Sequence, residues 1–213
     1  VTAGILTKGG ATVSSYAFTE NETNFASIVD KVVAAKPDAV ALISYDEAKK
    51  AIPAFQAKGF DGSKFYLVDG NLSDYSKESF ASYLNGSKGT LPGKATAESF
   101  KAKMNASYKK YTGKSLTDYS YGAETYDAVI LAAIAAQAAG KATGEAIKGQ
   151  LTAISLAGKG KTTVTSFAAA LKAIKAGKKV NYDGFSGPVE FDSNGDPTGA
   201  FIGIYKYDAK IGR

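Results

Sequence analysis

The apolar residues of the chain are spaced in two ways, which together predict alternating strands and helices. Continuous apolar runs at 39–43 and 65–68 are typical of parallel strands that are buried on both faces. In segments 25–35 and 46–58 the apolar residues recur at helical spacing instead. This β-α-β alternation indicates an α/β fold with a parallel sheet that is covered by helices.

The same two patterns predict the remaining elements. After Gly93 the spacing is mostly helical, so an α/β lobe is followed by a helix-rich segment with too few strands for a sheet of its own. The helix at 123–139 is apolar on nearly all sides and is therefore expected to be buried. Helices are also predicted at 1–8, 73–84, 96–111, 144–151 and 166–176, strands at 11–18, 188–191 and 200–207, and a loop at 86–93.

The composition removes several functions from consideration. The chain has no Cys and no His, so it lacks thiol nucleophiles, imidazole general bases and the commonest zinc ligands. Its 26 basic and 20 acidic residues give a net charge of +6, and the lysines are scattered as on solvated helix faces. No aromatic stacking platform or groove-reading motif accompanies them, so we expect no nucleic-acid partner. We likewise expect no catalytic residue, no metal and no cofactor.

Two segments resemble known ligand-binding loops only in part. Residues 155–162 end as a phosphate-binding loop ends, but Ser155 stands where the motif needs its first Gly, and a helix precedes it instead of a strand. Asp192, Asn194 and Asp196 alternate as at the start of a calcium loop, but the later Gly and Glu of that loop are missing. We expect a flexible loop in the first segment and a hairpin turn in the second.

Polar residues follow the two continuous apolar runs directly. Ser44 and Tyr45 come after the first run, and Asp69 and Gly70 come after the second. Ligands of open α/β sheets bind at the carboxyl ends of the strands, so these four residues form the candidate ligand-binding site. Asp69 would make a charge-assisted hydrogen bond to a cationic group, and Tyr45 offers a hydroxyl and a ring face. Asp69-Gly70 also fits a simple turn or a helix cap, and Asp46 fits the N-cap of the helix that follows it.

Five short segments carry the motifs of one protein family. They read FASIV at 25–29, PDAV at 37–40, AKGF at 57–60, TYDAV with later alanines at 125–140, and YDGFSGPVEFDSNGDP at 182–197. In this order and spacing they resemble the type I periplasmic binding proteins, in particular the solute-binding subunits of branched-chain amino acid ABC transporters. The resemblance covers the whole chain.

The resemblance implies two Rossmann-like lobes that close on a ligand. Residues 1–118 and 199–213 correspond to the second lobe, and residues 119–198 to a remnant of the first. The first half of the family's first lobe and the first strand of its second lobe have no counterpart here, so we expect the N-terminal portion to be missing. That strand would lie in the middle of a sheet, and its neighbours would be left with unpaired backbone groups. We expect the missing portion to be disordered, cleaved but still associated, or replaced by a second copy of the chain.

The resemblance further implies a binding protein without enzymatic activity. It would capture a small amino acid or a related amide and deliver it to the membrane permease of an ABC transporter. Asp69 corresponds to the acidic residue that binds the α-ammonium group of the ligand in this family, and Tyr45 corresponds to a neighbouring aromatic residue. Such a protein would lie in the periplasm or outside the cell, with or without a lipid anchor.

Two other functions stay open at this point. A ligand-sensing receptor module of the same fold would have the same motifs, and nothing within these residues separates sensing from transport. A flavodoxin-like or Rossmann-like enzyme would need a glycine-rich loop after a first strand, and the sequence contains no G-x-G-x-x-G.

Overall fold

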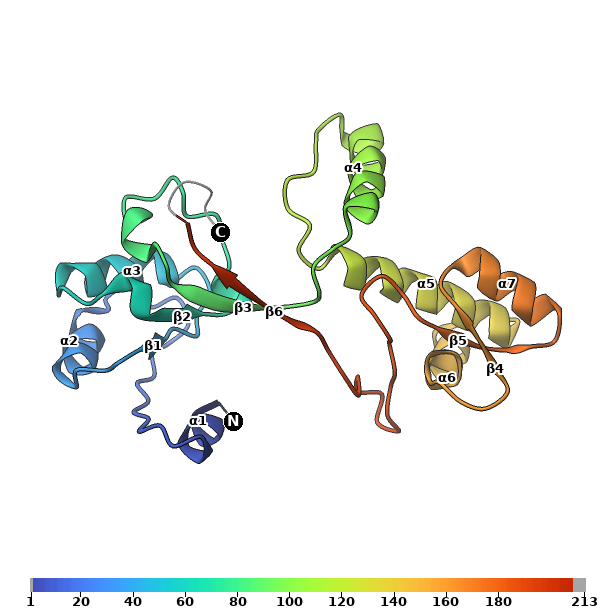
Figure 1. Ribbon diagram of the computed structural model, residues 1–213, viewed down its shortest axis with the longest axis horizontal. Helices are drawn as coiled ribbons and strands as arrows, with labels where there is room; N and C mark the ends of the chain where they lie inside the picture. The colour runs from blue at the N-terminus through green and yellow to red at the C-terminus, as the bar shows by residue number, and fades with distance from the viewer. Residues whose placement is uncertain (1, 209–213) are drawn as a thin grey trace. The chain divides into compact units, whose positions relative to one another are not determined.

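The computed structural model describes residues 2–208, which form two compact units (Figure 1). Unit 1 contains residues 2–91 and 204–208, and unit 2 contains residues 92–203. Each unit has a sheet and a hydrophobic core of its own.

The lobe boundaries drawn from the family resemblance lie after residues 118 and 198 and stay a prediction. The lobe boundaries state which lobe of the family's proteins each residue corresponds to. The two units are a different division, because they are the two parts of this chain that are compact by themselves. The predicted second lobe includes residues 1 and 209–213, which lie outside the described residues.

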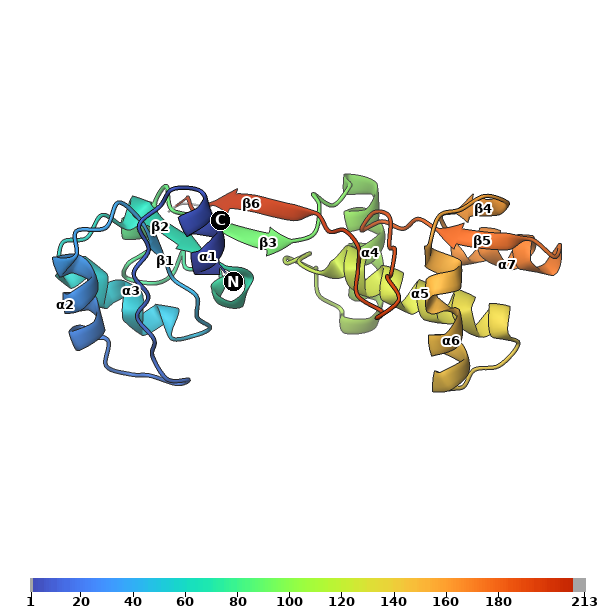
Figure 2. The same cartoon turned by 90° about the horizontal axis from the view of Figure 1, so that it is seen from below.

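Unit 1 is built on a four-stranded sheet with the order β1-β2-β3-β6. β1 pairs with β2, and β2 with β3, in parallel, so that Val40 lies opposite Phe65 and Tyr66 lies opposite Lys88. β6 runs antiparallel to β3, since the Gly86 N–H donates to the Tyr207 carbonyl and the Gly93 N–H to the Phe201 carbonyl (Figure 2). The three parallel strands, with helical segments between them, confirm the predicted α/β class. The elements are β1 (Val40–Ala41), β2 (Phe65–Leu67), β3 (Lys88–Pro92), β6 (Ile202–Lys206), α1 (Thr2–Lys8), α2 (Ala26–Ala34), α3 (Ala48–Ala57) and the 3₁₀ turns η1 (Gly62–Lys64), η2 (Asp69–Asn71) and η3 (Ser82–Leu84).

The core of unit 1 lies on one face of this sheet. Phe65 and Leu67 are buried, and the Phe65 ring packs against Phe55 of α3 with ring centroids 5.2 Å apart and ring planes at 90°. Tyr66 is 47% exposed, because successive side chains of a strand point to opposite faces. Ile43 is 58% exposed after β1. The prediction that both apolar runs are buried on both faces is therefore wrong for the described residues.

The strand predicted at 11–18 is not formed. The backbone there has no regular structure, its side chains are mostly exposed, and no described strand pairs with it. A strand is stable only when its backbone groups have ladder partners, so this segment stays irregular without one. The helix predicted at 1–8 is present as α1, but it buries none of its described side chains.

The helix predicted at 73–84 is replaced by turns, because side chains there form local bonds with the backbone. The Ser76 N–H donates to the Asp74 carboxylate at 2.9 Å, and the Tyr75 hydroxyl donates to the Asn71 carbonyl at 2.7 Å. Such bonds offer the backbone an alternative to the helical pattern. Only Ser82–Leu84, at the end of the segment, form a helical turn, which is the 3₁₀ turn η3.

The loop predicted at 86–93 contains β3 instead. Its Gly and Pro suggested a loop, but Gly89 is buried in the strand. The Tyr205 ring of β6 occupies the space that a Cβ at this position would need. The glycine is therefore a requirement of close packing between neighbouring strands and not a sign of a turn.

Unit 2 contains a two-stranded parallel sheet that the sequence did not predict. Its strands pair from Lys161 opposite Lys179 to Val164 opposite Tyr182, and Figures 1 and 2 show both beside α7. Both strands mix Lys, Thr or Asn with single apolar residues, so no apolar run marks them. The elements are β4 (Lys161–Val164), β5 (Lys179–Tyr182), α4 (Glu98–Thr112), α5 (Gly122–Ala139), α6 (Gly144–Ser155) and α7 (Phe167–Lys175).

Two further predictions for unit 2 are wrong in the described chain. α5 is not buried on all sides, since its buried residues lie along one side and Val129 is exposed. The strand predicted at 188–191 is reduced to isolated bridges, one from Asp183 to Pro188 and one from Phe191 to Pro197.

A buried carboxylate joins two of the family motifs. Asp127 of α5 is 1% exposed, and its Oδ1 accepts hydrogen bonds from the Tyr182 hydroxyl (2.7 Å) and the Phe185 N–H (3.1 Å). Its Oδ2 accepts from both the N–H (2.6 Å) and the hydroxyl of Ser186. A Cβ on Gly184 would collide with this carboxylate, so the turn needs glycine there. The TYDAV and YDGFSG motifs therefore form one structural cluster.

Both partial motifs have structural roles. The Lys161 ammonium donates to the carbonyl oxygens of Ala153 (2.7 Å) and Leu156, so it caps the end of α6. The Asp192 carboxylate accepts the Asn194 N–H at 2.8 Å and closes the predicted turn.

Within residues 2–208 no cluster of acidic side chains is suited to a metal ion. No helix in that part of the chain combines the length and apolar character needed to span a membrane.

Candidate functional site

The four candidate residues lie at the carboxyl ends of β1 and β2, which are neighbouring parallel strands. A Cβ on Gly70 would lie 2.8 Å from the Ser44 carbonyl oxygen and 3.1 Å from the Tyr45 ring. The structure therefore brings Ser44, Tyr45 and Gly70 together, and the absence of a side chain at Gly70 permits this approach. Asp69 precedes Gly70 in η2 and is exposed.

Asn71 ties the two strand ends together. Its amide group is buried, and its Nδ2 donates to the Leu42 carbonyl (2.8 Å) and the Ser44 hydroxyl (3.0 Å). Its Oδ1 accepts the Val68 N–H at 2.9 Å. A buried amide with three bonds to the segments that follow two strands fixes the backbone that carries the candidate residues. The sequence analysis missed this role, although an amide directly after the Asp-Gly pair was a usable signal.

Glu47 holds the loop that contains Tyr45. Its carboxylate accepts the Tyr45 N–H at 2.8 Å and the Asn21 N–H at 3.0 Å. The backbone N–H groups of Asn21, of Glu47 itself and of Tyr45 lower the pKa of the Glu47 carboxyl below its usual value. Asp46 does not cap α3 as predicted, because it is exposed and pairs with Lys49 at 3.2 Å, and the helix begins after Glu47.

Glu47 is expected to make part of the stability of unit 1 depend on pH. A carboxyl whose folded-state pKa lies below its ordinary value of 4.5 stabilises the fold above that value. This stabilisation is lost as the pH falls through the folded-state pKa. Urea unfolding at about pH 7 and about pH 3 should therefore show a larger acid loss for the wild type than for Glu47→Gln. Glu20→Gln, an exposed change in unit 1, should behave as the wild type, and equal losses in all three proteins would contradict the prediction.

The exposed members of the site are the ones that can meet a ligand. Tyr45 is 70% exposed and Asp69 is also exposed, whereas Ser44 is 7% exposed and its hydroxyl already accepts the bond from Asn71. A carboxylate and an accessible phenol ring, exposed after neighbouring strands, are both groups that attract a cationic ligand group.

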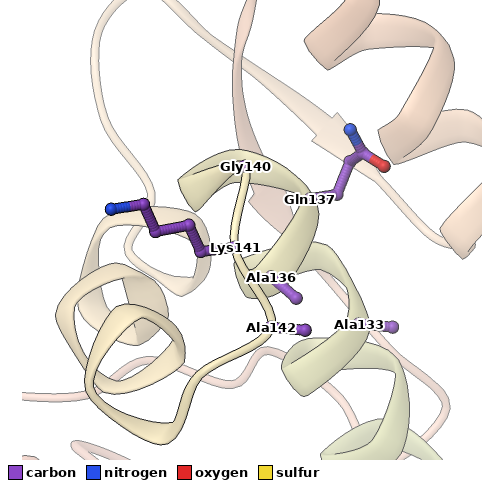
Figure 3. Close-up of a pocket in the computed structure, with 6 residues that line it drawn as sticks. All are labelled: Ala133, Ala136, Gln137, Gly140, Lys141 and Ala142. Atoms are coloured by element: carbon purple, nitrogen blue, oxygen red, sulfur yellow. The ribbon is translucent and has the colours of Figure 1, made fainter.

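An open hollow at the end of α5 lacks a set of polar groups like that of the strand-end site in unit 1 (Figure 3). Figure 3 shows the side chains of Lys141 and Gln137 extending in opposite directions, away from three alanine methyl groups. Binding sites for small molecules need polar groups that converge, so we do not regard this hollow as a candidate. Its lining residues are Ala133, Ala136, Gln137, Gly140, Lys141 and Ala142.

A protein-family model matches nearly the whole chain. The model is described as the receptor family ligand binding region, and it matches residues 4–208. No curated protein sequence matches the chain.

Solved structures with similar folds are bacterial binding proteins and receptors. The leucine-binding protein LivK from Thermotoga maritima MSB8 is 19% identical, with a TM-score of 0.65 over 94% of this chain and 50% of that one. LivJ from Streptococcus pneumoniae, in complex with isoleucine, is 19% identical, with a TM-score of 0.53 over 88% of this chain and 51% of that one. An extracellular ligand-binding receptor from Rhodopseudomonas palustris HaA2 is 20% identical, with a TM-score of 0.61 over 99% of this chain and 56% of that one.

The chain thus spans about half the length of these structures. At this level of identity the similarity to solved structures shows only the fold of the chain. The match to the family model shows which family the chain belongs to. Because that model covers residues 4–208 and the α/β fold agrees with it, the chain belongs to the receptor family ligand binding region, the family of the type I periplasmic binding proteins.

Proposed function

We propose that the chain is part of an extracytoplasmic solute-binding protein that binds a small amino acid or a related amide and delivers it to the permease of an ABC transporter. The family match across residues 4–208 is the observation that carries this proposal. Among the similar structures, one is named a leucine-binding protein, one a branched-chain amino acid transporter substrate-binding protein, and one a periplasmic binding protein. These names support a place in the periplasm or outside the cell, with or without a lipid anchor.

In this proposal the strand-end site of unit 1 binds the ligand. The Asp69 carboxylate pairs with the ammonium group of the amino acid, and the Tyr45 ring covers the ligand beside it. Ser44 and Gly70 supply the close-packed floor on which the Tyr45 ring rests. The support is that Tyr45 and Asp69 are exposed at adjacent strand ends while Asn71 and Glu47 hold the backbone around them. The role is non-catalytic, in line with the lack of His and Cys.

Calorimetric titration with amino acids, their amides and aromatic acids tests this function. Removing the charge in Asp69→Asn should weaken binding of an α-amino acid roughly 10- to 100-fold, since a hydrogen bond to a charged group is worth about 1.5–3 kcal/mol. Asp46→Asn is the matched control, because Asp46 is an exposed carboxylate that follows the neighbouring strand β1 and pairs with Lys49. It should bind as the wild type does.

Two outcomes would contradict the proposal. One is the absence of measurable binding for every compound in the series. The other is binding that Asp69→Asn and Asp46→Asn change equally, which would remove the specific role of Asp69.

A ligand-sensing receptor module is the second candidate function. The observation in its favour is that one similar structure is named an extracellular ligand-binding receptor. Reconstitution with a candidate permease in vesicles separates the two, because ligand-dependent transport is expected of a delivery protein and not of a sensor.

A further inference from the structure

The later half of α4 is exposed on every side. The first half packs on unit 2, where Phe100 is buried against the Phe185 ring with centroids 4.0 Å apart. Every residue at positions 106–115 is exposed, and Tyr111 is 80% exposed. Figure 1 shows this end of the helix pointing away from α5. The side chains of this end are therefore accessible to a partner.

This end of α4 is also strongly basic. Residues 99–117 contain five lysines and no acidic residue. Lys101 pairs with Glu98 at the start of the helix (2.8 Å), and within residues 2–208 the other four lysines take part in no ion pair. Positive charge that no carboxylate neutralises attracts an anionic partner. The five lysines are Lys101, Lys103, Lys109, Lys110 and Lys114.

Two tyrosines lie side by side on these turns, with a lysine on either flank. Tyr108 and Tyr111 are three residues apart, so they are neighbours on the helix surface. Successive residues of a helix are about 100° apart around its axis, which places Lys109 on one flank of the tyrosine pair and Lys110 on the other. The Lys110 ammonium lies 5.5 Å from the centroid of the Tyr111 ring. Tyrosine rings and lysine side chains both favour the boundary between water and lipid, because each has an apolar part and a polar end.

Local bonds keep this end of α4 in shape. The helix ends at Gly113, whose φ of 72° is left-handed. The Lys114 N–H donates to the Thr112 hydroxyl at 3.2 Å, and the Leu116 N–H donates to the Asn105 side-chain oxygen at 2.8 Å. The segment after the helix is thus tied back to it. A surface that is ordered before binding loses less entropy when it meets a partner.

We propose that the later half of α4 docks on an anionic phospholipid surface. The lysines pair with lipid phosphates, and the tyrosine rings lie at the level of the head groups. A nucleic-acid strand fits this surface less well, because strand binding uses a basic groove that follows the backbone, whereas these side chains surround the end of a helix. The docking uses none of the residues proposed to bind a solute, so it does not rest on the proposed transport function.

A second basic segment of unit 2 provides a matched comparison. Residues 166–182 contain four lysines and no acidic residue, but their two aromatic residues are half-buried (Phe167) and buried (Tyr182). This segment therefore has the positive charge of α4 without its exposed tyrosines. The four lysines are Lys172, Lys175, Lys178 and Lys179.

Co-sedimentation with vesicles tests the proposal. We would use vesicles of phosphatidylcholine alone and of phosphatidylcholine mixed with anionic phosphatidylglycerol. Binding is expected only to the anionic vesicles, and it should weaken as salt is added, because salt screens the charges. Lys109→Gln/Lys110→Gln should weaken binding about 10-fold or more, since each lysine near an anionic surface contributes roughly 5-fold. Lys172→Gln/Lys175→Gln removes the same charge from α7 and should bind as the wild type does.

Tryptophan fluorescence locates the contact, because the chain has no Trp of its own. The emission of a Tyr111→Trp variant should move to shorter wavelength on anionic vesicles. Tyr66→Trp is the control, since Tyr66 of unit 1 is also exposed and also lies beside a lysine (Lys88, 5.9 Å), and its emission should not change.

The inference is overturned if anionic vesicles are not bound, if the two pairs of lysine changes weaken binding equally, or if the two tryptophan variants respond alike. Binding to polyuridylate that Lys109→Gln/Lys110→Gln removes, without binding to vesicles, would replace lipid by nucleic acid as the partner. None of these outcomes bears on solute binding by unit 1, which is measured separately by calorimetry.

Discussion

Asp127→Asn is expected to destabilise unit 2 by about 3 kcal/mol, because it leaves buried donors without an acceptor. The carboxylate accepts four hydrogen bonds, from the Tyr182 hydroxyl, the Phe185 N–H, and the N–H and hydroxyl of Ser186. An amide of the same shape replaces one accepting oxygen by an NH₂ group, which then faces donors. Burial, and then the bond from its hydroxyl to Asp127, raise the pKa of Tyr182, so that this hydroxyl stays protonated and able to donate even at alkaline pH.

Urea unfolding and hydrogen exchange measure this effect. The free energy of unfolding should fall, and exchange should accelerate at the backbone amides of Phe185 and Ser186 before it does in unit 1. Asp196→Asn makes the same chemical change at an exposed position and should alter the stability by less than about 0.5 kcal/mol. Similar stabilities for the two variants would show that the bonds to Asp127 contribute little beyond what water could supply.

The Asp127 cluster also shows how far the sequence alone predicts structure. The motifs TYDAV and YDGFSG were visible in the sequence, but nothing in their spacing indicated that the Asp127 carboxylate would bind the turn after Tyr182. The two residues are far apart in the chain, and their contact is a product of tertiary packing. Local patterns report which residues form an element, whereas a buried side-chain bond depends on where that element lies.

Elements with strong periodicity were predicted, and elements without it were not. α3 was predicted because its apolar residues repeat at helical spacing, and Ile52 and Phe55 are buried as expected. β4 and β5 were missed because each mixes polar residues with few apolar ones. The predicted helix at 73–84 failed because local bonds from Tyr75 and Asp74 favour turns.

The position of the candidate site was predicted from the sequence, but the residues that support it were not. The rule that ligand-binding residues follow parallel strands placed Ser44, Tyr45 and Gly70 at one edge, and the structure brings them together. The rule names no supporting residue, so Asn71 and Glu47 were not foreseen. Their roles depend on the distance between two strand ends and a distant loop, which no local pattern contains.

Asn71→Ala is expected to loosen the strand-end site without removing any residue that we propose touches the ligand. The change deletes bonds to the Leu42 carbonyl, the Ser44 hydroxyl and the Val68 N–H. Each buried group left without a partner costs about 1–3 kcal/mol, so we expect a loss of at least about 2 kcal/mol in the stability of unit 1. Asn85→Ala, an exposed change in the same unit, should cost less than about 0.5 kcal/mol.

The consequence for binding separates support from direct contact. If Asn71 positions Tyr45 and Asp69, its loss should weaken ligand binding and also speed hydrogen exchange at Leu42, Ser44 and Val68. Asp69→Asn should weaken binding with unchanged exchange at these three residues, because it removes the charge that we propose pairs with the ligand and leaves the three bonds of Asn71 in place. An Asn71→Ala variant with faster exchange and undiminished affinity would show that the geometry of these strand ends does not control binding, and the ligand contacts would then have to be sought away from β1 and β2.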